Sequence, residues 1–351
     1  MEVKFSHPSA HRRRARPASG RVSSTGSGAA GPRGIFLYGG SAAVHIDSSA
    51  LNVQEPGARP RAVEFFSGIG AFAQAAGHAG VEVVAAFDQG QAANRAYEHN
   101  YGRLPISRNL DTISAGEVPA AAIWWMSPPC TPFSVRGRRM DDRDPRAASF
   151  INLIRLAGER RPATMFVENV EGFAGSRVHS MLMEMLSACS YNVRQYRLCP
   201  TLFGVPMRRP RLFVVAQRER EPAADFPAAC LRLPLADFLE DKPDPALIVE
   251  PPVLERYQAG FDVVDPRRAE AYLTCFTSGY WRCMKASGSL LVMPDRRVRR
   301  VSPEEILRLL GFSEEFRFPP DIGRQTRWRL AGNSVDVRAV RFCLSAAGVG
   351  G

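Results

Sequence analysis

A cysteine that follows two prolines is the first residue of this chain whose type and position could do chemistry. The apolar run 120–126 is followed by Ser127, Pro128, Pro129 and Cys130. Because proline cannot donate to a sheet ladder, the two prolines end the predicted strand and stiffen the turn after it. Cys130 is therefore predicted to lie at the carboxyl end of a strand, where ligands bind in open α/β sheets. Free cysteines are also commonly small buried apolar residues, so position alone does not decide its role.

A carboxylic acid occupies the equivalent position one β-α-β unit later. The run 163–167 leads directly into Glu168. Since neighbouring parallel strands lie about 5 Å apart, the side chains of Cys130 and Glu168 can reach one small ring. A thiolate and a carboxylic acid on one heterocycle form a recognisable chemical pair, although acids at helix starts are common. Further on, Arg209 and Arg211 stand at a strand start, where they could clamp a phosphate or brace the thiol.

The elements before this pair predict a binding site for an adenosine-containing ligand. The β run 62–66 is followed by Gly68 and Gly70, which permit a tight turn and close backbone approach before a helix. Asp88 ends the next predicted strand and is placed to bind the two hydroxyls of a ribose. Asp111 could accept from an adenine amino group. The glycine loop alone does not separate a nicotinamide cofactor from S-adenosylmethionine.

Together these motifs resemble those of the cytosine 5-methyltransferases that use S-adenosylmethionine. The matching stretches come in family order and cover about 61–217 and 295–345; they are 64–70, Asp88, 128–134, 168–170, 204–211 and 332–335. The resemblance implies that Cys130 attacks carbon 6 of the pyrimidine and that Glu168 holds and protonates ring nitrogen 3. Arg209 and Arg211 match the active-site arginine motif of the family. The positions implied to contact the cofactor are Phe66, Gly68, Gly70, Asp88, Asp111, Pro129, Asn333 and Ser334.

The expected fold is α/β, a doubly wound, mostly parallel sheet of the Rossmann-like methyltransferase type, with a small target-recognition domain. Residues 1–60 are rich in Arg, Ser, Gly, Ala and Pro and predict a disordered basic extension. We expect the catalytic and cofactor domain over 61–217 and the target-recognition region over 218–294. Residues 295–351 would return to the catalytic domain.

The substrate is predicted to be nucleic acid, with DNA ahead of transfer RNA because the wider family acts mostly on DNA. The run from Cys275 to Tyr280, with Ser287 to Leu290, resembles instead the branch that methylates the anticodon loop of transfer RNA. A target base inside a helix would have to be flipped out. A nicotinamide oxidoreductase would leave Cys130 and Glu168 without a role. A non-catalytic nucleic-acid binder predicts the loss of one of them.

Composition supports these expectations without choosing between them. The 351 residues carry a formal net charge of +11, which suits a polyanionic partner. The seven cysteines are scattered without a CxxC pair, so neither a disulfide framework nor a metal site is predicted. No apolar run is long enough to span a bilayer, and we expect no membrane partner. We therefore expect a cytoplasmic protein, as a monomer.

Overall fold

The computed structural model describes residues 58–133, 140–228, 230–283 and 285–350. The predicted basic extension, 1–60, lies almost wholly outside this range, as does Ser134 at the end of the cysteine motif. Within the described residues, no helix is both long and apolar enough to cross a membrane. Monomeric state and cytoplasmic location stay predictions.

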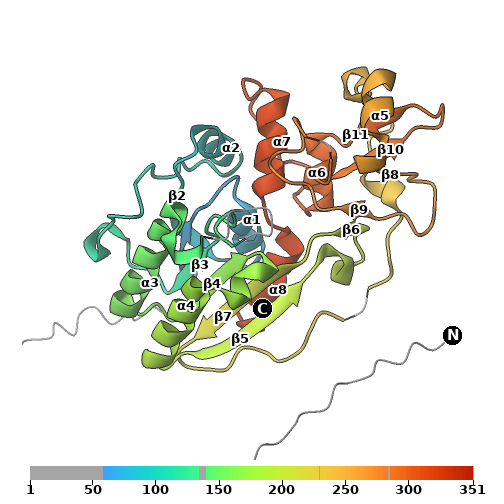
Figure 1. Ribbon diagram of the computed structural model, residues 1–351. Coiled ribbons are helices and arrows are strands. Elements are labelled where there is room, and N and C mark those ends of the chain that lie inside the picture. The colour runs from blue at the N-terminus through green and yellow to red at the C-terminus, as the bar shows by residue number, and fades with distance from the viewer. Residues whose placement is uncertain (1–57, 134–139, 229, 284, 351) are drawn as a thin grey trace, which may run out of the picture. The chain divides into compact units, whose positions relative to one another are not determined.

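Six strands form the central sheet and confirm the predicted α/β class (Figure 1). They are β1 Arg61–Phe65, β2 Glu82–Phe87, β3 Ile123–Met126, β4 Thr164–Asn169, β5 Asn192–Leu198 and β7 Arg211–Gln217. Their order is β2-β1-β3-β4-β7-β5. Strands β1 to β4 pair in parallel, and β7 is antiparallel to both of its neighbours. The carboxyl ends of β1 to β4 therefore meet at one edge.

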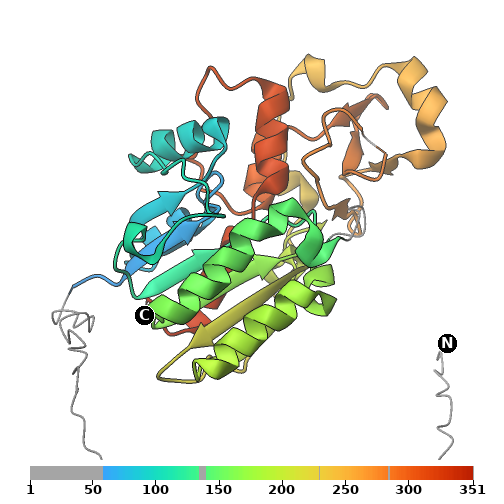
Figure 2. The ribbon, with the colours of Figure 1, turned by 60° about the vertical axis from the view of Figure 1, so that its left-hand side comes forward.

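Helices cover both faces of this sheet, with α1 and α8 on one face and α3 and α4 on the other (Figure 2). The helices are α1 Ala71–His78, α2 Gln91–Tyr101, α3 Ala148–Arg160, α4 Arg177–Ala188, α5 Pro251–Tyr257, α6 Pro303–Leu309, α7 Arg324–Asn333 and α8 Val337–Ala346. Short 3-10 helices span Ala115–Glu117, Asp141–Arg143, Pro145–Ala147, Glu171–Gly175, Pro200–Phe203, Leu235–Phe238, Pro245–Leu247 and Gln258–Gly260.

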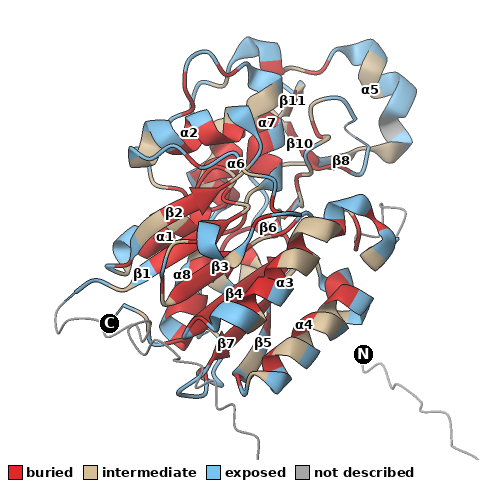
Figure 3. Ribbon diagram, turned by 90° about the vertical axis from the view of Figure 1, so that its left-hand side faces the viewer, coloured by how far each residue is buried: buried red, intermediate tan, exposed pale blue. Residues whose placement is uncertain are grey.

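Strand β3 shows how the sheet is held between the helix layers. All four of its side chains are buried, as expected of a strand covered on both faces. Because side chains alternate along a strand, Trp125 stacks on Phe72 of α1 at 5.1 Å between ring centroids. Trp124 instead joins the apolar cluster under α3 and α4. Figure 3 shows the resulting buried sheet between exposed outer helix faces.

Two smaller sheets lie in and beside the predicted target-recognition region. Strands β8 Asp262–Val264, β10 Ser289–Val292 and β11 Val298–Arg300 form one of them. Strands β6 Met207–Arg208 and β9 Leu273–Thr274 pair in parallel and join the arginine motif to this region. Strand β11 lies beyond residue 294, so this sheet takes in chain from both sides of the predicted boundary. The domain division stays a prediction.

Two elements differ from the sequence prediction. Strand β3 begins at Ile123 rather than at residue 120, because its pairing with β1 and β4 starts there, opposite Ala62 and Thr164. Helix α7, which ends with Gly332 and Asn333 of the matching stretch 332–335, was not predicted from the sequence. A strongly polar helix carries little apolar periodicity, which explains why the sequence did not indicate it.

Candidate active site

The turn after β3 places Cys130 at the predicted sheet edge. Ser127 donates its hydroxyl to the carbonyl of Phe66 at 3.1 Å, which ties this turn to the end of β1. The side-chain amide of Asn169 donates to the carbonyl of Pro128 at 3.0 Å, which ties it to the end of β4. Cys130 is exposed and lines a cavity. Three neighbouring strand ends therefore fix the thiol beside this cavity.

Glu168 and Arg211 form a largely buried ion pair within the same cavity. The distance from Arg211 Nε to Glu168 Oε1 is 3.4 Å, and the side chains are 16% and 11% exposed. Burial raises the pKa of the Glu168 carboxyl, and the charges of Arg211 and Arg209 oppose this. Glu168 therefore keeps its proton to higher pH than an exposed glutamate.

The thiol of Cys130 is subject to the same two effects. Although its side chain reaches solvent inside the cavity, the surrounding protein desolvates it and raises its pKa, and Arg211 partly offsets this. Glu168 adds a further rise. Formation of the Cys130 thiolate at neutral pH therefore requires stabilisation of its charge, either by the arginines or by a bound substrate.

Arg209 is buried and joins three separate segments of the chain. Its Nη1 donates to the carbonyl of Phe276 at 2.9 Å, and its Nη2 donates to the carbonyls of Gly332 at 3.1 Å and Ser334 at 2.5 Å. The same Nη1 lies 3.0 Å from Cys275 Sγ. Arg209 therefore connects the predicted target-recognition region with the end of α7.

A cavity of about 1030 Å³ collects the predicted residues. This is at or above the upper end of the ~300–1,000 Å³ usual for small-ligand sites, so it has room for two ligands side by side. Eleven of the twelve predicted site residues line it, namely Phe66, Gly68, Asp88, Asp111, Pro129, Cys130, Glu168, Arg209, Arg211, Asn333 and Ser334. The predicted cofactor and catalytic residues thus share one continuous cavity.

Gly70, the twelfth predicted residue, shapes the loop rather than the cavity wall. Its φ is +88°, and a Cβ at this position would lie 2.2 Å from the Cε2 atom of Tyr101. Both the left-handed backbone and the aromatic ring exclude a side chain there. The sequence could not reveal this contact because Tyr101 lies one β-α unit away.

Asp88 holds the glycine loop from the end of β2. Its two carboxylate oxygens accept from the backbone N–H of Gly68 at 2.9 Å and of Gly90 at 2.7 Å. A carboxylate has about four lone-pair sites, so it can still accept from a ligand hydroxyl. Asp111 accepts from the hydroxyl of Ser149 in the same cavity.

Two residues with evident roles at this site were not predicted as site residues. Asn169 braces the turn before Cys130, and its place in the matching stretch 168–170 was the available signal. Cys275, one of the scattered cysteines, lies against Arg209 and Arg211. Nothing local in the sequence indicates that contact, since 66 residues separate Cys275 from Arg209.

Residues 61–245 match the protein family described as C-5 cytosine-specific DNA methylase. The chain belongs to this family. It is therefore a cytosine C-5 methyltransferase that acts on nucleic acid, with S-adenosylmethionine as its methyl donor. Membership in this family excludes the alternative that the chain is a nicotinamide oxidoreductase.

Relatives in the family carry two kinds of name. The chain is 29% identical to a Schizosaccharomyces pombe "tRNA (cytosine(38)-C(5))-methyltransferase", over 82% of this chain and 96% of that protein. It is 26% identical to a Dictyostelium discoideum "DNA (cytosine-5)-methyltransferase", over 80% and 92% of the two chains. Among solved structures, the S. pombe Dnmt2 methyltransferase has a TM-score of 0.74 at 28% identity, over 82% and 98%. The Entamoeba histolytica methyltransferase EhMeth has a TM-score of 0.77 at 23% identity and shares the fold.

The residues of the cavity fit the methyl donor of this family. Asp88 and Asp111 supply carboxylates suited to ribose hydroxyls and an adenine amino group. Ser67 Oγ is buried in the cavity wall and has no hydrogen-bond partner among the described residues. A buried hydroxyl of this kind costs free energy unless a ligand pairs with it. The cofactor half of the cavity is therefore suited to a polar ligand.

Proposed function

We propose that this chain transfers a methyl group from S-adenosylmethionine to carbon 5 of a cytosine in the anticodon loop of transfer RNA. Relatives from S. pombe, mouse and human are each named tRNA (cytosine(38)-C(5))-methyltransferase. The family resemblance predicted DNA as the substrate, and that preference is not supported by these relatives. DNA stays the second candidate because of the Dictyostelium relative.

One contact carries the choice of transfer RNA. The segment Cys275 to Thr277, whose sequence resembles the branch that methylates transfer RNA, is bonded directly to Arg209. A Cβ on Gly332 would lie 2.6 Å from the carbonyl carbon of Thr277, so α7 packs against the same segment. The feature typical of that branch is therefore part of the catalytic centre. This location supports a substrate preference built into the site.

In this proposal Cys130 and Glu168 act at two atoms on opposite sides of one cytosine ring, carbon 6 and nitrogen 3. Cys130 Sγ forms a bond to carbon 6, and the ring electrons move toward nitrogen 3. Glu168 supplies the proton that nitrogen 3 takes up, which its raised pKa favours. Bound S-adenosylmethionine supplies an electrophilic methyl group to carbon 5.

The second half of the reaction restores the aromatic ring. Carbon 5 releases its proton to solvent water, and the electrons of that bond re-form the double bond to carbon 6. The bond from carbon 6 to Cys130 Sγ breaks, Cys130 leaves as a thiolate, and nitrogen 3 returns its proton to Glu168. Arg211 stays next to Glu168 throughout and stabilises its anionic form when the proton is on the base. Each residue of the chain ends in the state in which it began.

Tritiated methyl transfer from S-adenosylmethionine tests this proposal. Matched pools of transfer RNA and genomic DNA are incubated with the wild type and with Cys130→Ala, and labelled transfer RNA is mapped by bisulfite sequencing. We expect label in transfer RNA at one anticodon-loop cytosine, lost in the variant. Label confined to DNA would contradict the proposed substrate.

A further inference from the structure

Arg209 is a buried guanidinium without a carboxylate partner among the described residues. Its side chain donates to three backbone carbonyls, and the residue is only 4% exposed. Burial lowers its pKa because the charged form is desolvated. A buried ion is unfavourable unless a counter-charge compensates it. The one side-chain acceptor that the described residues offer this guanidinium is Cys275 Sγ, 3.0 Å from Nη1.

The sulfur of Cys275 is close to a second guanidinium as well. Arg211 Nη2 lies 3.8 Å from it. Burial raises the pKa of the Cys275 thiol, but Arg209 and Arg211 together outweigh burial, and the net shift is downward. A cysteine ionises readily when two guanidinium groups lie next to its sulfur.

The backbone around Cys275 is held by hydrogen bonds on both sides. Thr274 N donates to Ser289 Oγ at 2.7 Å, and Thr277 N donates to the carbonyl of Ser287 at 2.9 Å. Tyr280 closes this segment by donating its hydroxyl to the carbonyl of Ser289 at 2.6 Å.

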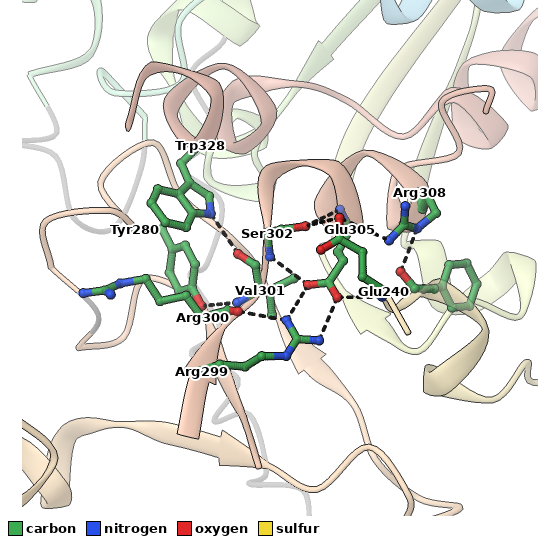
Figure 4. A network of polar contacts seen from close by, with 10 residues as sticks. Glu240, Tyr280, Arg299, Arg300, Val301, Ser302, Glu305, Arg308 and Trp328 are labelled. Atoms are coloured by element: carbon green, nitrogen blue, oxygen red, sulfur yellow. Dashed lines mark hydrogen bonds and ion pairs between the residues drawn. The ribbon is translucent and has the colours of Figure 1, made fainter. Parts of the chain in front are cut away.

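The network in Figure 4 anchors Tyr280 in turn. Its hydroxyl accepts from Val301 N at 3.0 Å, and Trp328 of α7 donates to the carbonyl of Val301 at 2.8 Å. Directly beside Val301, Arg299 and Glu305 form a buried ion pair at 2.7 Å. The segment that carries Cys275 is therefore tied rigidly to α6 and α7.

We propose that Cys275 is a positioning residue whose thiolate is the counter-charge of Arg209 and Arg211 in the catalytic centre. It holds Arg209 in place and limits how much of the positive charge of Arg211 acts on Glu168. This role rests on the proposed function, since it concerns the same reaction. Cys275 forms no bond to the substrate in this account.

The proposal has a consequence for the pH dependence of the reaction. Without the anion, Arg211 would act more strongly on its other neighbours and lower the pKa of both Glu168 and Cys130. Cys130 would then ionise, and Glu168 would lose its proton, at lower pH. The ionisable groups around Cys275 are Arg209, Arg211, Cys130 and Glu168 at the centre, and Asp262 of β8, which accepts from Thr274 Oγ1 and Ser289 Oγ.

The ionisation of Cys275 can be measured without any activity. The ultraviolet absorbance of thiolate is followed against pH for Cys130→Ala and for Cys130→Ala/Cys275→Ser, and the difference reports Cys275 alone. We expect a thiolate signal already present at neutral pH. A signal that rises only near the ordinary cysteine pKa of about 8.5 would overturn the proposal.

The positioning role is tested by single-turnover methyl transfer to transfer RNA across pH. Cys275→Ser should move the whole profile to lower pH by about one unit, and Cys275→Asp, which restores a negative charge, should move it back. Cys283→Ser removes an exposed thiol of the same segment and should leave the profile unchanged. A wild-type profile in Cys275→Ser, or equal profiles in the serine and aspartate variants, would overturn the proposal. If the wild type itself fails to methylate transfer RNA, the proposed function fails, and the absorbance measurement still decides whether Cys275 ionises.

Discussion

Arg211 Nε lies 3.4 Å from Glu168 Oε1, and the same guanidinium lowers the pKa of the neighbouring Cys130 thiol. One cation thus acts on both groups that the proposed reaction needs in opposite protonation states. Burial raises the pKa of each, which favours the protonated form of Glu168 and opposes ionisation of Cys130, while Arg211 acts against burial at both groups. The balance between burial and Arg211 therefore sets the pH range in which both states coexist.

Replacing Glu168 by glutamine should remove proton transfer to the base while keeping the shape of the site. We expect kcat to fall by about 10²–10⁴-fold, the usual contribution of a general acid. Single-turnover methyl transfer measures this. Glu171→Gln changes an exposed acid three residues later and should have wild-type activity. Equal loss in both variants would argue against a specific role of Glu168.

Glu64 should make the folded state less stable as pH rises. Burial raises the pKa of Glu64 from 4.5 to about 8, although Tyr97 donates to its carboxylate at 2.9 Å. Between these values the unfolded chain releases the proton and the folded chain keeps it. The free energy of unfolding therefore falls by up to about 1.4 kcal/mol for each unit by which the pH rises in this range.

Thermal unfolding of the wild type and of Glu64→Gln across this pH range measures that effect. The melting temperature of the wild type should fall more steeply with pH than that of the variant. Parallel curves would show that Glu64 ionises alike in both states.

Gly332→Ala should destabilise the junction between α7 and the segment of Thr277. The added Cβ would lie 2.6 Å from both the carbonyl carbon and the oxygen of Thr277, and Arg209 binds the carbonyl of Gly332. We expect a loss of about 1–3 kcal/mol in the free energy of unfolding, together with reduced methyl transfer. Gly323 lies before the same helix, and a Cβ added there would meet no atom within 4 Å, so Gly323→Ala should be nearly neutral. Denaturant unfolding compares the two, and similar values would contradict the packing argument.

Asp88→Ala should weaken binding of S-adenosylmethionine. The variant loses a ribose acceptor and also the two bonds that order the backbone of Gly68 and Gly90. A charged hydrogen bond contributes about 1.5–3 kcal/mol, so we expect affinity to fall by roughly 10- to 100-fold. Titration calorimetry with the cofactor measures this, with Glu82→Ala at the opposite end of β2 as the control. Unchanged affinity in Asp88→Ala would remove this residue from the cofactor site.

The sequence predicted the edge of the sheet at which Cys130 and Glu168 meet, for a simple physical reason. Both follow short apolar runs, and parallel strands bring such ends to one edge. The paired strands β1, β3 and β4 bear this out, and both residues line one cavity. The glycine loop and Asp88 were predictable as neighbours because each follows one of two strands, β1 and β2, that pair in parallel.

Contacts between distant segments could not be predicted in this way. The packing of Gly70 on Tyr101 and of Gly332 on Thr277 depends on tertiary structure that no local pattern encodes. The same holds for Cys275, whose importance arises only when Arg209 and Arg211 fold against it. The prediction of the substrate required a choice between two resemblances. The preference for DNA, which rested on the frequency of DNA enzymes in the family, is not supported by the relatives.

The proposed reaction requires a covalent bond from Cys130 Sγ to carbon 6 of a transfer RNA cytosine. A cytosine with fluorine at carbon 5 cannot lose a proton there after methylation, so the adduct should accumulate. Transfer RNA and DNA substituted in this way are each incubated with S-adenosylmethionine and the wild type or Cys130→Ser, and complexes are resolved by denaturing electrophoresis. We predict a stable complex of the wild type with transfer RNA and none with the variant. A complex formed equally well by Cys130→Ser, or formed only with DNA, would contradict the account.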